Sequence, residues 1–170
     1  MRTLIAILVA CAALSGTSGS ASAQSALERS ERDDIVLVPE DNAAMAAAFR
    51  KARASLDGFL KLLDAPPPGT HTYSVKLRVS DAGFTEYFWV GNLKRQNERF
   101  SGTIDNIPRR VKTVRQGQVM VFGRHEILDW MYLDDMQRRM AGNFTACALL
   151  TLETPQAAAD YKKRMGLVCD

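Results

Sequence analysis

The first strong pattern along the chain is helical. Apolar side chains recur every three or four positions through an alanine-rich stretch, with polar residues between them. Asp41 and Asn42 offer a helix cap before this stretch, and three prolines followed by Gly69 end it. We therefore predict a long amphipathic helix over residues 42–63. Its apolar face carries Met45, Phe49, Leu56, Phe59, Leu60 and Leu63.

Beyond residue 69 the period of the pattern changes to two. Apolar and polar residues alternate over residues 73–79, which is typical of a strand with one buried and one exposed face. Short apolar segments separated by turn residues follow, and their close spacing favours an antiparallel sheet. The predicted strands are 73–79, 84–91, 99–104, 111–114, 118–122, 128–132 and 143–152.

The last predicted element is a helix with clear signals at both ends. Thr154 suits the N-cap, Pro155 suits the first helical position, and Gly166 suits the C-terminal stop. Helices kept apart from a run of strands predict an α+β fold. We expect the long N-terminal helix to pack on a strongly bent antiparallel sheet, or across the end of a small, partly open barrel, with a short helix at the C-terminus.

The start of the chain has the form of an export signal. Arg2 supplies a positive charge, residues 4–14 an apolar core, and Ala21-Ser22-Ala23 a small-residue cleavage site. This pattern predicts a signal peptide over residues 1–23 and a mature chain that begins near Gln24. The predicted location is therefore periplasmic or secreted.

A second interpretation of the leader is lipoprotein processing, with Cys11 as the acylated residue. The apolar core is far shorter than the about 18 residues that span a bilayer, so we expect no transmembrane helix. Residues 24–40 are charged and aperiodic apart from a short apolar run at 35–38, and predict a mobile segment with one edge strand. Residues 41–170 are enough for a single domain.

Charge and cysteine content narrow the possible partners. Of the 22 Lys and Arg residues one, Arg2, lies in the leader, which contains none of the 19 Asp and Glu residues, so the mature net charge is +2. This near balance argues against a nucleic-acid-binding protein. Cys147, which the pattern places in an apolar strand, and Cys169 remain after processing. An exported chain permits a disulfide between them, and two free thiols are the alternative.

Asp129 stands in the most distinctive sequence of the chain, between Leu128 and Trp130. In a strand, Trp130 and Tyr132 point to the face opposite Asp129. The structural interpretation buries the two aromatic rings and uses the Asp129 carboxylate to cap or anchor nearby backbone. The functional interpretation is an acidic group beside an aromatic platform that binds a sugar or a peptide.

Other chemistry has weaker signals. His125-Glu126 resembles the start of a zinc-binding helix, but the flanking pattern is that of a strand, so we expect an exposed turn histidine and no metal or other cofactor. No nucleophile motif or nucleotide-binding glycine pattern occurs in the chain. Acidic pairs of the glycosidase type could be drawn from four residues. These are Glu86, Asp105, Glu126 and Asp129.

Basic residues gather on neighbouring predicted strands and turns. They are Lys94, Arg95, Arg99, Arg109, Arg110, Lys112 and Arg115. On one shared face they would attract an anionic envelope polymer, lipid headgroups or an acidic protein. The alternative is a solvated sheet face that keeps the protein soluble.

Several separated motifs, in the same order, resemble the YegJ-like family of bacterial proteins (domain of unknown function 2314). They are Met45 with Lys51-Ala52-Arg53, Pro67-Pro68-Gly69, Glu86-Tyr87-Phe88-Trp89-Val90, Gly102-Thr103-Ile104-Asp105-Asn106-Ile107-Pro108, Val111-Lys112 before Gly117, and Ile127-Leu128-Asp129-Trp130-Met131-Tyr132. The resemblance covers residues 41–150 and stops before the last helix. The family tends to Asn-Asn-x-Pro where this chain has Asp105. The resemblance implies a small exported or envelope module and no established activity, cofactor or catalytic residue.

Together these patterns predict an exported envelope protein that acts as a noncatalytic binding or interaction module. The expected partner is an envelope protein or an anionic envelope polymer. The candidate binding surface consists of Trp89, Asp105, Asn106, Pro108, Arg109, Arg110, Lys112 and Asp129. The alternative function is a small carboxylate-dependent hydrolase that acts on cell-wall material through acids near Asp129.

Overall fold

The computed structural model describes residues 42–169 of the chain. The predicted signal peptide, Cys11 and the predicted edge strand at 35–38 all lie outside the described residues. Among residues 42–169, no helix is long and apolar enough to cross a membrane.

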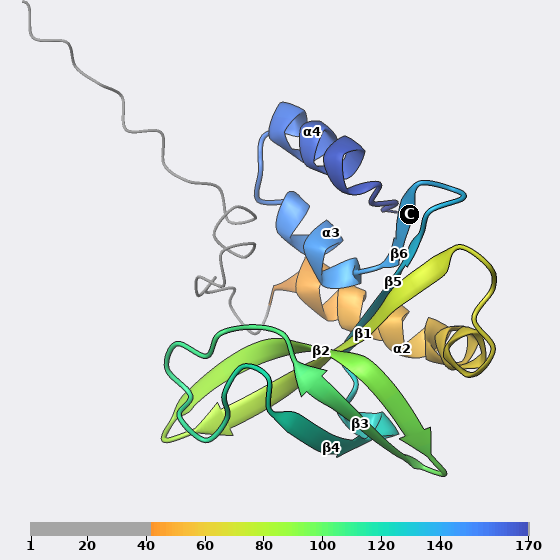
Figure 1. Ribbon diagram of the computed structural model, residues 1–170. Coiled ribbons are helices and arrows are strands. Elements are labelled where there is room, and N and C mark those ends of the chain that lie inside the picture. Colours follow the sequence, from red (N-terminus) through yellow and green to blue (C-terminus); the bar gives the residue numbers. More distant parts are fainter. Residues whose placement is uncertain (1–41, 170) are drawn as a thin grey trace, which may run out of the picture.

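Six antiparallel strands form an open sheet in the order β4-β3-β2-β1-β5-β6, which confirms the α+β class with a strongly bent sheet (Figure 1). Val75 at the centre of β1 pairs with Val90 of β2 on one side and with Trp130 of β5 on the other. Register shifts in β1 and β2 bend the sheet. The strands are β1 (Thr70–Asp81), β2 (Phe84–Gln96), β3 (Arg99–Ile104), β4 (Val119–Gly123), β5 (Asp129–Asp134) and β6 (Arg139–Gly142).

Helix α2 (Ala43–Asp64) packs along one face of this sheet and creates the main core (Figure 1). Its N-cap is Asn42, whose Oδ1 accepts a hydrogen bond from the Met45 amide at 2.9 Å. The Phe59 ring stacks on Trp130 with centroids 5.0 Å apart, and Tyr132 is buried beside them. The expectation that Trp130 and Tyr132 belong to the core is confirmed.

The predicted strand at 143–152 is wrong, because this segment forms helix α3 (Phe144–Leu150). Asn143 has a φ of 52°, a left-handed conformation that breaks the extended chain after β6. The alanine and leucine residues that follow are strong helix formers. Cys147 therefore lies on a helix and not in a strand.

The predicted strand at 111–114 is also wrong, since this segment belongs to the loop between β3 and β4. Backbone amides in this loop bind a carboxylate in place of a neighbouring strand, as described below. Strand β6 was not predicted, and β2 continues five residues beyond the expected end at residue 91. Strand β3 has the predicted bounds.

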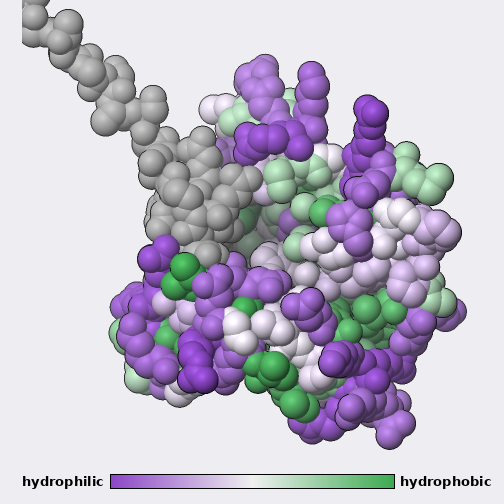
Figure 2. Space-filling view, in the orientation of Figure 1, coloured by the Kyte–Doolittle hydropathy of each residue, from purple (hydrophilic) through white to green (hydrophobic). Residues whose placement is uncertain are grey.

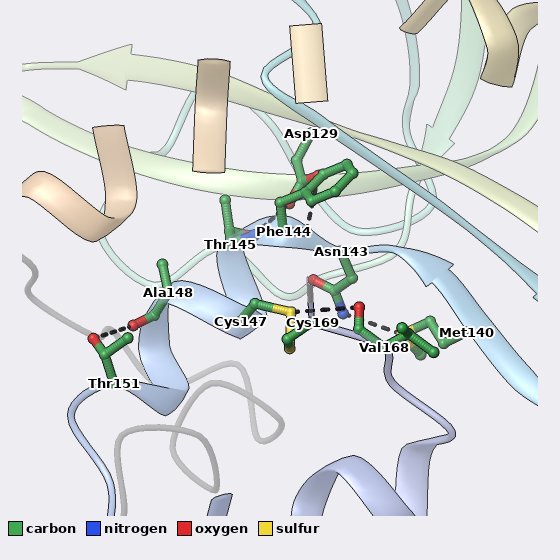
Figure 3. Close-up of a disulfide and its surroundings, with 10 residues drawn as sticks. All are labelled: Asp129, Met140, Asn143, Phe144, Thr145, Cys147, Ala148, Thr151, Val168 and Cys169. Carbon is green, nitrogen blue, oxygen red and sulfur yellow. Dashed lines mark hydrogen bonds between the residues drawn. A yellow bond between two sulfur atoms is a disulfide. The ribbon is translucent and has the colours of Figure 1, made fainter. Parts of the chain in front are cut away.

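A second small core joins β6, α3 and α4 (Pro155–Met165). Thr154 caps α4 and Gly166 ends it in the left-handed conformation, as predicted. Cys147 and Cys169 form a disulfide that ties the C-terminal tail to α3 (Figure 3). Of the two thiol states left open by the sequence, the structure has the bridge.

Candidate functional site

Asp129, the residue singled out as an anchor or a catalytic acid, is completely buried at the start of β5. Its Oδ2 accepts hydrogen bonds from the Thr145 amide at 2.8 Å and the Thr145 hydroxyl at 2.7 Å. Its Oδ1 accepts from the Trp130 amide at 2.8 Å and from the Phe144 amide at 3.3 Å. Figure 3 shows Asp129 beside Phe144 and Thr145 at the start of α3. The carboxylate thus binds the first turn of α3, which confirms the interpretation as a backbone anchor.

Asp129 lies in one line across three neighbouring strands with Lys76 and Trp89. Lys76 lies directly opposite Asp129 in β5 and opposite Trp89 in β2. Its Nζ donates to the Thr145 hydroxyl at 2.6 Å and lies 4.4 Å from the centre of the Trp89 ring. Burial lowers the pKa of Lys76, and the nearby Asp129 opposes this shift. Burial likewise raises the pKa of Asp129, while Lys76 and the donated hydrogen bonds oppose it.

Glu86 is a second buried acid that binds backbone. Its carboxylate accepts hydrogen bonds from the amides of three successive loop residues: Arg109 at 3.0 Å, Arg110, and Val111 at 3.1 Å. Such a run of amides is an anion site, and here a side chain of the same chain fills it. Glu86 therefore holds the loop against β2 and is committed to that contact.

The loop after β3 runs along the part of β2 that β3 leaves uncovered. Trp89 donates its amide to Asn106 Oδ1 at 2.6 Å, and the Asp105 amide donates to the Trp89 carbonyl at 2.9 Å. The Arg110 guanidinium lies 3.9 Å from the centre of the Phe84 ring. Partial burial raises the pKa of Asp105.

The structure therefore brings most of the predicted binding surface together. Trp89 and the loop residues Asp105, Asn106, Pro108, Arg109, Arg110 and Lys112 lie along β2, whereas Asp129 lies two strands away and has no exposed surface. Whether this surface binds a partner stays a prediction.

The predicted basic cluster does not share one face. Arg95 and Arg99 stand at the β2–β3 turn, whereas Arg110 and Lys112 lie beside Phe84 and the β1–β2 turn. These two ends of the 13-residue strand β2 are separated by about 40 Å when the strand is extended. The cationic surface is thus divided into two parts.

One part borders a depression that the sequence did not reveal, with a volume of about 630 Å³. We call it the basic groove. It opens between α2, the β2–β3 turn and the short helix η1 (Arg124–Glu126). Leu56 and Ile127, both buried, contribute apolar lining. The lining residues are Arg53, Leu56, Glu98, Arg99, Gly123, Arg124, His125 and Ile127.

The groove carries three arginines against one acid, Glu98. Arg124 also pairs with Asp57 on α2 at 2.5 Å, and this contact lowers the pKa of Asp57. Glu126, beside the groove, accepts a hydrogen bond from the Gly123 amide at 2.6 Å. Among the lining residues the arginines outnumber the acids and could bind an anionic group, while Asp57 and Glu126 beside the groove offset part of that charge.

The metal-binding interpretation of His125 has no geometric support. Among residues 42–169, no group of three His, Cys, Asp or Glu residues gathers where it could hold a metal ion. His125 is exposed in η1 and lines the basic groove. The other histidine, His71, bonds Asp135 through Nε2 at 3.0 Å.

The fold and these sites define a small α+β protein in which buried acids anchor backbone and a basic groove faces solvent. The chain belongs to the family described as "Uncharacterized protein conserved in bacteria (DUF2314)", which matches residues 42–168. The match confirms the predicted resemblance and extends it through α4. The chain is 29% identical over 133 residues to the uncharacterized protein YegJ of Escherichia coli (strain K12), covering 78% of this chain and 84% of that protein. No solved structure matches it.

Proposed function

We propose that this protein is a noncatalytic binding module of the bacterial cell envelope, which holds an anionic envelope polymer in the basic groove. The observation that carries the proposal is the gathering of Arg53, Arg99 and Arg124 around one open depression. Guanidinium groups bind carboxylate and phosphate oxygens well because they present several donors in a planar fork.

The hydrolase alternative has less support. A glycosidase-type mechanism needs two acids that face a substrate with free oxygens. Glu86, Glu126 and Asp129 already accept hydrogen bonds from protein amides. Asp105 alone cannot provide the pair, so we favour binding over catalysis.

Binding to a test polyanion examines the groove directly. We expect the full chain to bind dextran sulfate and not uncharged dextran, with an affinity that falls as salt rises. Arg53→Gln together with Arg99→Gln should weaken binding at least about tenfold, because each lost charge-assisted hydrogen bond is worth about 1.5–3 kcal/mol. Binding that is unchanged in this variant would contradict the proposal.

A matched control removes two charges at the other end of β2. Arg110→Gln with Lys112→Gln has the same change in net charge but leaves the groove intact, so we expect little loss of affinity. Loss in this control alone would move the binding site to the loop along β2.

Export is tested separately by the intact mass of the protein recovered from the periplasm. A chain beginning at Gln24 is expected, and a diacylated Cys11 would contradict the predicted processing.

A further inference from the structure

Strand β4 is an edge of the sheet whose outer side has no partner strand among the described residues. The Ile104 amide donates to the Gln118 carbonyl at 3.0 Å, and the register continues with Met120 opposite Gly102. Backbone polar groups alternate along an antiparallel strand. The Gln118 carbonyl and the amides and carbonyls of Met120 and Phe122 therefore face β3, whereas Val119 and Val121 turn theirs outward.

The same two residues expose apolar side chains. Val119 is 64% exposed and Val121 is 59% exposed, although both belong to a regularly paired strand, Val119 as its first residue and Val121 at its centre. Figure 2 shows hydrophobic side chains at the surface where Figure 1 places β3 and β4. Soluble proteins usually protect such an edge with a charge, a proline or a bulge. The sequence of β4, Val-Met-Val-Phe-Gly, has none of these.

We propose that β4 pairs antiparallel with β4 of a second copy of this chain, around a two-fold axis at Met120. In this register Val119 lies opposite Val121 of the second copy, and the two residues exchange both of their backbone hydrogen bonds. The exposed valines then contact each other across the interface on one face. The Gly123 amide, which already bonds Glu126, is not needed.

The chemistry of the edge favours a second copy as its occupant. The strand has no charge, so its two-fold pairing places no like charges opposite each other, and each free donor at Val119 and Val121 meets an acceptor of the same spacing. A depression of about 270 Å³ beside the valines offers further surface for the facing copy. Its other lining residues are Gln96, Arg99, Phe100 and Ser101.

The size of the contact sets its strength. Two five-residue strands bury less than the about 1,200–2,000 Å² that is typical of stable interfaces. We therefore expect a weak dimer that forms with rising concentration and dissociates on dilution.

Disulfide trapping tests the register, using the full chain with Cys11→Ser as background. In the proposed pairing Met120 faces its own copy in a non-hydrogen-bonded position, where Cα atoms are about 4.5 Å apart and a disulfide fits. Met120→Cys should form a covalent dimer under oxidation. Val119→Cys is the matched control, because its two copies lie beyond the about 7 Å limit for a bridge. Equal trapping of both variants, or trapping of Val119→Cys alone, would overturn the register.

Sedimentation of the chain without introduced cysteines tests the dimer itself. We expect the weight-average mass to rise with concentration, and Val121→Lys to raise the dimer dissociation constant at least tenfold because it places a charge on the edge. Val121→Thr keeps the shape and the strand preference and should change the constant less. A chain that stays monomeric up to about 1 mM would refute the proposal, since a dissociation constant above that concentration is weaker than a specific dimer contact needs.

Discussion

The anchor formed by Asp129 makes a sharp prediction for the variant Asp129→Asn. The substitution keeps the size of the side chain but replaces one acceptor oxygen by an NH₂ group. In the wild type Oδ2 accepts from both the amide and the hydroxyl of Thr145, at 2.8 and 2.7 Å. Each oxygen accepts two hydrogen bonds, so whichever way the new amide group turns, at least one buried backbone amide loses its acceptor, and Lys76 loses its counter-charge.

The expected cost can be bounded from these contacts. A buried donor without an acceptor costs about 1–3 kcal/mol, and breaking a buried ion pair costs about 3–5 kcal/mol. Lys76 is only partly buried, so the lower end of the second range applies. We expect the free energy of unfolding to fall by about 3 kcal/mol. With a urea m-value of about 2 kcal/mol/M, the unfolding midpoint would fall by about 1.5 M.

Urea unfolding followed by tryptophan fluorescence measures this change, since Trp130 is next to the substitution. Asp135→Asn is the matched control, because Asp135 is exposed and its contact with His71 should contribute less than about 1 kcal/mol. A double-mutant cycle with Lys76→Met should show that the two substitutions together cost less than their sum. If Asp129→Asn lowered the midpoint no more than Asp135→Asn, the anchoring role would be refuted.

Three further outcomes follow from local geometry. Gly142→Ala should lower the free energy of unfolding by about 2–4 kcal/mol in thermal melts, because a Cβ at φ +77° would lie 2.2 Å from the Trp130 carbonyl oxygen. Gly117→Ala has a similar φ of +78° but open space around its Cβ, and should cost about 1 kcal/mol. Equal losses in the two variants would contradict this reasoning. Reduction of the Cys147–Cys169 bond, 22 residues apart, should lower stability by about 3 kcal/mol in urea, and the variant with serine at both positions should not respond to the reductant. Because burial raises the folded-state pKa of Asp105 above its ordinary value of 3.8, wild-type stability falls as pH rises through that pKa. In thermal melts, Asp105→Asn should be more stable than the wild type by at most about 0.5 kcal/mol at pH 7 and should match it below about pH 3.8. If the variant stayed more stable in acid, burial of the Asp105 charge would not be the cause.

The parts of the fold with local signals could be predicted from the sequence. Helix α2 and strand β3 follow from hydrophobic periodicity, and α4 follows from Thr154 at its start and Gly166 at its end. Helix α3 could not be predicted in this way, because its first turn is capped from a distant strand by Asp129. The loop near Val111 was mistaken for a strand because its amides bind Glu86, a residue 25 positions earlier.

The site shows the same division. Alternation in β5 placed Trp130 in the core and left Asp129 to bind backbone, and the structure agrees. The basic groove has no sequence motif, because Arg53, Arg99 and Arg124 are far apart in the chain. Arg53 lies on α2, Arg99 begins β3 and Arg124 begins η1, so no local pattern links them before the fold brings them together.

Glu86 and Asp129 perform the same task at two places where the backbone leaves the sheet ladder. One binds the amides of the loop after β3, and the other binds the amides at the start of α3. Backbone donors that leave a ladder need acceptors when they are buried, and a carboxylate satisfies several at once. Acid substitutions should therefore lower stability while the folded molecules still bind a polyanion, whereas loss of Arg53 and Arg99 should lower binding and leave stability nearly unchanged. Opposite results for the two classes would refute both the anchoring role of the two acids and the proposed binding site in the basic groove.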